Sequence, residues 1–89
     1  MTKKEIVKAM LDAVLEAEEL TGGHLFFDYS PHVDAVGVFT YTTKTYSTDC
    51  RGSDLVYLMN TGTELTEEAL DALRWRLLPE NLRKVWTKA

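Results

Sequence analysis

The chain has little of what fixes a protein covalently or places it in a membrane. Cys50 is the single cysteine among 89 residues, so no disulfide can form within the chain and the fold must depend on a packed core. No stretch approaches the roughly 18 apolar residues of a membrane span. Lys8, Asp12 and Glu16 interrupt the first apolar segment, which excludes the apolar stretch of a signal peptide. These absences predict a cytoplasmic protein with no membrane partner.

Repeats, low-complexity tracts and linkers are absent as well. Segments 22–23 and 61–63 contain glycine but lack the lysine or repeated glycines of a phosphate-binding loop, so they are interpreted as turns. Apolar residues make up 45% of the chain and charged residues 27%, which is typical of a globular protein. A chain of this length has room for one core, and residues 1–89 are predicted to form a single domain.

Charge is distributed unevenly along the chain. The formal net charge is −4, which opposes binding to phosphate backbones and favours a protein partner. Residues 1–50 carry four basic and eight acidic side chains, whereas the segment from Arg74 onward carries five basic residues against Glu80. The C-terminal segment is therefore locally basic, which leaves nucleic acid open as an alternative partner.

The first helix is predicted over residues 3–20. Thr2 and Glu5 have the spacing of a capping box, and Gly22 and Gly23 supply a left-handed stop. Its apolar residues recur at helical spacing. They are Ile6, Val7, Met10, Leu11, Val14 and Leu15.

A second helix is predicted to begin after Thr66, with Leu65 placed to pack against Leu70. Proline ends or kinks a helix but suits its first turn, so Pro79 predicts a third helix over residues 79–87. The predicted buried residues of these two helices are Ala69, Leu70, Leu73, Leu77, Leu82, Val85 and Trp86.

Between the helices, β-branched and aromatic residues predict antiparallel strands. The predicted strands are 24–30, 35–41 and 45–50, joined by turns at 30–34 and 42–44. Residues 54–59 are ambiguous: Leu55, Leu58 and Met59 fit a helical face, whereas Leu55, Tyr57 and Met59 fit one face of a strand. A fourth strand is favoured over a short helix.

The predicted fold class is therefore α+β. An N-terminal helix precedes a three- or four-stranded antiparallel meander, and one or two C-terminal helices follow. We expect the helices to pack on one face of the sheet.

No group of residues has the pattern of an established catalytic or metal site. Cys50 beside Arg51 could have a lowered thiol pKa, but neighbouring strand residues point to opposite faces. His24 and Asp28 share a strand face, yet their spacing is not that of a known metal site. The other acid–base or ligand candidates are His32, Asp34 and Asp49. The sequence predicts no catalytic residue, no metal and no cofactor, and a small enzyme that uses Cys50 or His24 with Asp28 is the third hypothesis.

Two surfaces are candidates for binding. The strands carry aromatic residues on both faces, and an apolar sheet face left uncovered by helices would mark an interaction site. The C-terminal segment combines cations with two indoles, although a tryptophan near a chain end also often pins that end to the core. The predicted binding surface comprises Phe26, Phe39, Tyr41, Tyr46, Arg74, Trp75, Arg76, Arg83, Lys84 and Trp86.

The leading hypothesis is a non-catalytic binding or regulatory module that acts through protein contacts, in its simplest form as a homodimer that associates through the sheet. The second hypothesis is a nucleic-acid-binding accessory protein that uses the basic C-terminal helices.

Overall fold

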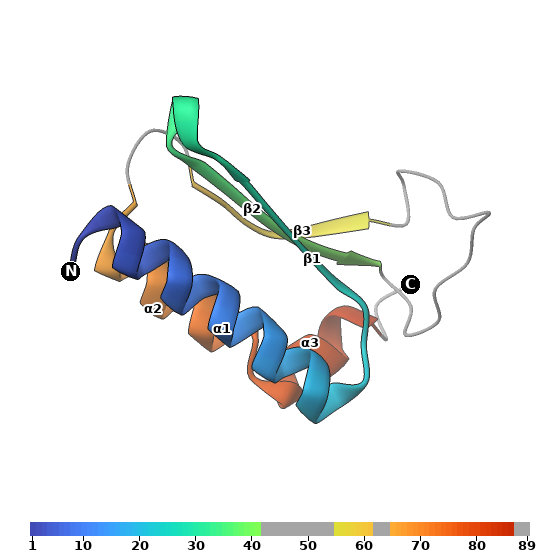
Figure 1. Ribbon diagram of the computed structural model, residues 1–89. Coiled ribbons are helices and arrows are strands. Elements are labelled where there is room, and N and C mark those ends of the chain that lie inside the picture. Colours follow the sequence, from blue (N-terminus) through green and yellow to red (C-terminus); the bar gives the residue numbers. More distant parts are fainter. Residues whose placement is uncertain (42–54, 62–64, 87–89) are drawn as a thin grey trace.

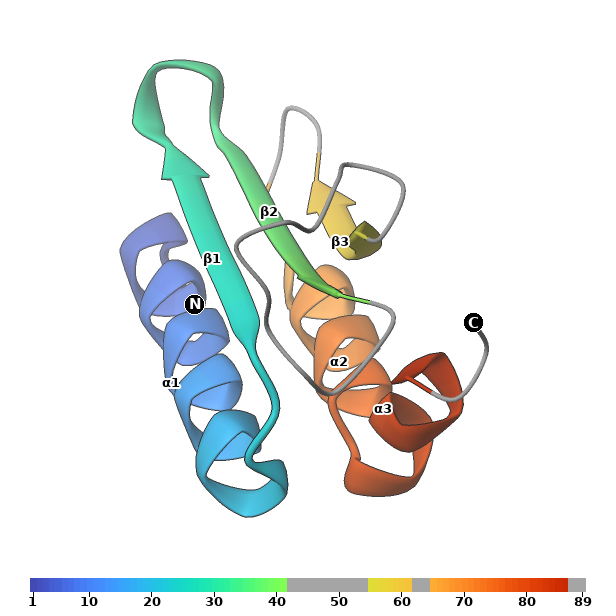
Figure 2. The ribbon, with the colours of Figure 1, turned by 90° about the vertical axis from the view of Figure 1, so that its right-hand side faces the viewer.

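A three-stranded antiparallel sheet is covered on one side by three helices (Figures 1 and 2). The computed structural model describes residues 1–41, 55–61 and 65–86. In chain order the elements are α1 (Lys3–Thr21), β1 (Leu25–Ser30), the short 3-10 helix η1 (Pro31–Val33), β2 (Ala35–Tyr41), β3 (Leu55–Thr61), α2 (Glu67–Arg76) and α3 (Pro79–Trp86). The predicted fold class is confirmed, including two C-terminal helices. None of the described helices combines the length and the apolar character needed to cross a membrane.

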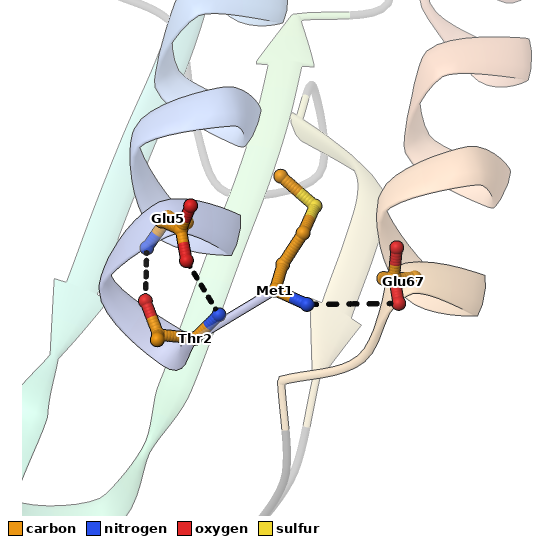
Figure 3. A network of polar contacts seen from close by, with 4 residues as sticks. All are labelled: Met1, Thr2, Glu5 and Glu67. Carbon is orange, nitrogen blue, oxygen red and sulfur yellow. Dashed lines mark hydrogen bonds and ion pairs between the residues drawn. The ribbon is translucent and has the colours of Figure 1, made fainter.

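Both ends of α1 are formed by the residues predicted for them. The Thr2 hydroxyl accepts a hydrogen bond from the Glu5 amide at 3.2 Å, and the Glu5 carboxylate accepts one from the Thr2 amide at 2.9 Å (Figure 3). The hydrogen bonds from Thr2 lower the pKa of Glu5. At the same end of the molecule, the Met1 ammonium lies 3.8 Å from the Glu67 carboxylate at the start of α2 (Figure 3). Gly22 ends the helix with φ 69°.

The buried stripe of α1 is narrower than the apolar pattern predicted. The buried residues are Ile6, Met10, Val14 and Ala17. Leu11 and Leu15 are exposed, and Leu15 keeps 52% of its surface accessible. The sheet and α2 cover one side of α1, and these two leucines lie beyond that side.

The strands are ordered β1-β2-β3, and both pairings are antiparallel. β2 pairs with β1 on one side and with β3, residues 55–61, on the other. The predicted strand 45–50 and the predicted turn 42–44 lie outside the described residues. Segment 55–61 brings Leu58 and Met59 into the core. Segment 45–50 is mostly polar and contains fewer apolar side chains that could be buried in a core.

A β-bulge explains why residues 54–59 were ambiguous. Val38 pairs with Met59 and Phe39 pairs with Tyr57, so Leu58 is the extra residue on β3. The bulge breaks the alternation of faces: Leu58 and Met59 are both buried, and Tyr57 points away from the helices. The strand preference is confirmed, but the expectation that Tyr57 and Met59 share a face is wrong.

A buried hydrogen-bond chain joins the C-terminal helix to the sheet. Trp86, at the end of α3, keeps only 4% of its surface exposed, and its indole N–H donates to the Thr40 hydroxyl at 3.1 Å. That hydroxyl donates in turn to the backbone carbonyl of His24, just before β1. Thr40 is completely buried, and it is the buried polar side chain of the described core. These two hydrogen bonds satisfy polar atoms that burial would otherwise leave without partners.

We predict that Thr40→Val lowers the free energy of unfolding by about 1–2 kcal/mol, because a side chain of similar shape leaves the Trp86 indole N–H without an acceptor in the core. Urea denaturation measures this loss. The ¹⁵N-correlated indole signal of Trp86 should shift, whereas that of exposed Trp75 should not. An unchanged Trp86 signal would contradict the role assigned to the Thr40 hydroxyl.

Candidate functional site

Three aromatic rings form a row across the sheet, on the side away from the helices. Phe26 of β1 stacks on Phe39 of β2 with ring centroids 5.2 Å apart and planes 11° apart. The rings of Phe39 and of Tyr57 in β3 are tilted relative to each other, with centroids 5.5 Å apart. The register pairs Phe26 with Phe39 and Phe39 with Tyr57, so one residue from each strand contributes. We call these three residues the aromatic face.

No described helix covers the aromatic face, because α1, α2 and α3 all lie on the opposite side of the sheet (Figure 1). The side chains that the sheet turns toward the helices are different ones: Val36 and Val38 are fully buried, and Phe27 packs against the core. Tyr57 is 65% exposed. Among the described strand positions that share the outer side, Asp28 is the charged residue.

A groove of about 300 Å³ lies at the corner where β3 meets α2 and α3. We call it the corner groove. It is lined by Val56, Tyr57, Leu58, Trp75, Arg76, Asn81, Lys84 and Val85. Tyr57 belongs to both surfaces, so the corner groove continues from the aromatic face around the edge of the sheet.

The lining of the corner groove is apolar and aromatic, with two cations. Trp75 is 63% exposed although it is one of the largest apolar side chains of the protein. Arg76 donates a hydrogen bond to the carbonyl of Leu58, the bulged residue of β3. Asn81 donates to the Trp75 carbonyl at 2.7 Å, which holds the start of α3 against the end of α2. Lys84 supplies the second cation, and the described lining contains no carboxylate.

The structure brings together some of the residues predicted as a binding surface. Phe26 and Phe39 belong to the aromatic face, and Trp75, Arg76 and Lys84 line the corner groove.

Other predicted surface residues lie elsewhere. Trp86 is in the core, so its inclusion in a binding surface is wrong and the alternative, that it pins the chain end, describes it. The Arg74 guanidinium lies 3.9 Å from the Asp71 carboxylate. Arg74 lines a different groove, of about 330 Å³, between α1 and α2. Arg83 is exposed on α3 but is not part of the corner-groove lining. Tyr41 lies in β2, its side chain is outside the described part, and Tyr46 is outside the described residues.

Tyr57 was missing from the sequence-predicted surface, although it joins the two surfaces. The sequence contained one sign of its position: the apolar pattern of 54–59 fitted neither a regular strand nor a helix fully, and such a break indicates a bulge. Which residue a bulge turns outward depends on the partner strand, and only the register with β2 places it.

The residues considered for catalysis and metal binding are dispersed in the described part of the chain. His24 and Asp28 are exposed, and His32 lies in η1. The Asp34 carboxylate pairs with the Lys3 ammonium at 2.7 Å, which ties the β1–β2 turn to α1. Across residues 1–41, 55–61 and 65–86, no three His, Cys, Asp or Glu side chains form a group that could hold a metal ion. Cys50 and Asp49 lie outside these ranges.

Comparison of the chain with protein families, with curated proteins and with solved structures finds no match.

Proposed function

We propose that the protein is a non-catalytic binding module that acts through protein contacts, and that a second copy of the chain binds to its aromatic face. The observation that carries this proposal is the row of Phe26, Phe39 and Tyr57, with Tyr57 65% exposed. Large aromatic residues dominate the energetics of protein interfaces. A sheet side without a described helix leaves such residues available for contact.

A second copy is favoured by the charge of this side of the sheet. In a two-fold contact a surface meets itself, so any charge at its centre faces its own copy. The three aromatic residues are uncharged, Asp28 lies beside their row and not within it, and the acidic residues of α1 lie on the other side of the sheet. Two aromatic faces can therefore meet without like charges at the centre, even though the chain carries a net charge of −4.

We predict that Tyr57→Glu weakens self-association by about 30-fold or more, because it removes a central aromatic contact and places a carboxylate of each copy near that of the other. Sedimentation velocity over a wide concentration range measures the dissociation constant. Leu15→Glu is the matched control, since Leu15 is also exposed and lies on α1, away from the sheet surface. Its dissociation constant should equal that of the unmodified protein.

Two results would count against this proposal. One is a protein that stays monomeric at every concentration. The other is self-association that Leu15→Glu and Tyr57→Glu reduce equally, because the contact would then not depend on the sheet.

The two other hypotheses stay predictions. Nucleic-acid binding by the basic C-terminal helices has weaker support, because Arg74 lies in a different groove from Arg76 and Lys84 and the cations do not form one track. An enzyme that uses Cys50 concerns a residue outside the described part of the chain.

A further inference from the structure

The corner groove differs in character from the rest of this acidic protein. Its two cations, Arg76 and Lys84, lie among apolar and aromatic side chains, and no carboxylate is part of its described lining. Of the acidic residues described on α2 and α3, Glu67 and Glu68 occupy the first turn of α2, Asp71 pairs with Arg74, and Glu80 lies in the first turn of α3 without being part of the groove lining. The described lining of the groove therefore carries a net positive charge, on a chain whose total charge is −4.

The size and lining of the groove fit an apolar side chain. Its volume of about 300 Å³ lies at the small end of ligand-binding pockets and suits one or two side chains. Tyr57 and Trp75 are both about two-thirds exposed, which leaves two broad apolar surfaces in water. Val85 and Val56 contribute aliphatic surface to the same lining. Tryptophan, tyrosine and arginine are the residue types most enriched where interfaces derive their affinity.

Arg76 can take part in recognition while it keeps its present contact. One of its guanidinium nitrogens donates to the Leu58 carbonyl, and the group has five N–H donors in total. The contact holds the guanidinium at the edge of β3, so less conformational entropy is lost when it binds a carboxylate. It also occupies a backbone acceptor of the edge strand, which opposes the addition of another strand at Leu58.

We infer that the corner groove binds an acidic peptide segment of a partner protein, with one apolar or aromatic side chain between Tyr57 and Trp75 and carboxylates toward Arg76 and Lys84. The inference does not depend on self-association through the aromatic face. A nucleic acid fits less well, because two cations on an acidic chain neutralise few phosphates. A second copy of the chain fits less well too, because a groove that binds a different surface of its copy produces a ring or an open-ended assembly and not the two-fold dimer that is commonest among oligomers.

A random-peptide phage library selected on the full chain tests this inference. We expect enriched peptides that combine Asp or Glu with a Trp, Phe or Leu. The most enriched peptide, synthesised with a fluorescent label, is then measured by anisotropy at increasing salt, and its affinity should fall as salt rises.

Variants locate the site of that peptide. Lys84→Glu and Trp75→Ala should each weaken its binding by about tenfold or more. Arg74→Glu is the matched control for charge, since it changes the net charge equally but lies in the groove between α1 and α2. Leu78→Ala is the control for lost apolar surface, because Leu78 is exposed and lines that same other groove. Both controls should bind the peptide as the unmodified protein does.

The remaining outcomes overturn the inference. They are no enrichment, a basic consensus, or an equal loss of binding in Arg74→Glu and Lys84→Glu. Single-stranded oligothymidylate that binds and is lost in Lys84→Glu would assign the groove to nucleic acid. Self-association that is lost in Lys84→Glu but kept in Phe26→Glu, a substitution in the aromatic face and outside the described groove lining, would assign it to a second copy. Circular dichroism of each variant verifies that it is folded, and peptide selection on the unmodified chain decides the inference even where a variant does not fold.

Discussion

Trp86→Ala is expected to lower the free energy of unfolding by about 3–5 kcal/mol, the largest loss from any single substitution considered for this protein. The Trp86 ring is almost completely buried at the end of α3, and it packs against the backbone of Gly23 between α1 and β1. Its indole N–H donates to the hydroxyl of Thr40, near the end of the central strand β2. The substitution removes the contacts of α3 with Gly23 and with Thr40. The neighbouring side chains are fixed in other elements, so they cannot fill the cavity that remains.

Urea denaturation followed by circular dichroism measures this loss. Small domains have about 5–15 kcal/mol of stability in total, so the variant should be partly unfolded at ambient temperature if the protein lies near the lower limit. Trp75→Ala is the matched control, because it removes the same side chain from a position that is 63% exposed. It should change stability by no more than about 0.5 kcal/mol. Equal losses from the two substitutions would show that Trp86 is not part of the core.

Gly23→Ala is expected to cost about 3 kcal/mol, at the upper end of the range for overpacked cores. A Cβ atom at Gly23 would lie 2.2 Å and 2.3 Å from two carbons of the Trp86 ring. The ring cannot move aside freely, because it is buried and held by its hydrogen bond to Thr40. The backbone between α1 and β1 must therefore shift, or the indole must leave its site.

The neighbouring glycine separates steric overlap from backbone strain. Gly22 has φ 69°, and a Cβ atom added to it would meet nothing within 4 Å, so Gly22→Ala should cost about 1 kcal/mol through conformation alone. In a Trp86→Leu background, which lacks the ring, the cost of Gly23→Ala should nearly vanish while that of Gly22→Ala persists. A cost of Gly23→Ala that is the same in both backgrounds would contradict the packing described for Trp86.

The two tryptophans illustrate how much of the candidate site the sequence could reveal. Both lie in apolar-basic segments, Trp75 near the end of α2 and Trp86 at the end of α3, and the sequence assigned both to one surface. Trp86 is buried because it packs against Gly23 and bonds to Thr40 in the core, whereas Trp75 lies outside the core and lines the corner groove. Residue type and spacing do not distinguish these positions, since the direction of α3 is decided by contacts with residues far away in the chain.

The sheet presents the same contrast. Alternation within β2 alone places Phe39 on the opposite side from Val36 and Val38, because side-chain direction in a regular strand is a local property. Alternation alone did not show which of the two sets the helices would cover. In β3 the bulge at Leu58 reversed the expected side of one residue, and it did so through pairing with β2, a strand much earlier in the chain.

The amino-acid sequence by itself determined the helices and their ends. The Thr2 and Glu5 capping box, the stop at Gly22 and the start of a helix at Pro79 depend on hydrogen bonds and backbone angles within a few residues, and all are present as predicted. Tertiary structure alone decided which side of the sheet is left without a described helix, which tryptophan is buried, and that Tyr57 joins the aromatic face to the corner groove. The physical reason is that burial depends on the elements that pack over a residue, and their contacts connect parts of the chain that local pattern does not relate.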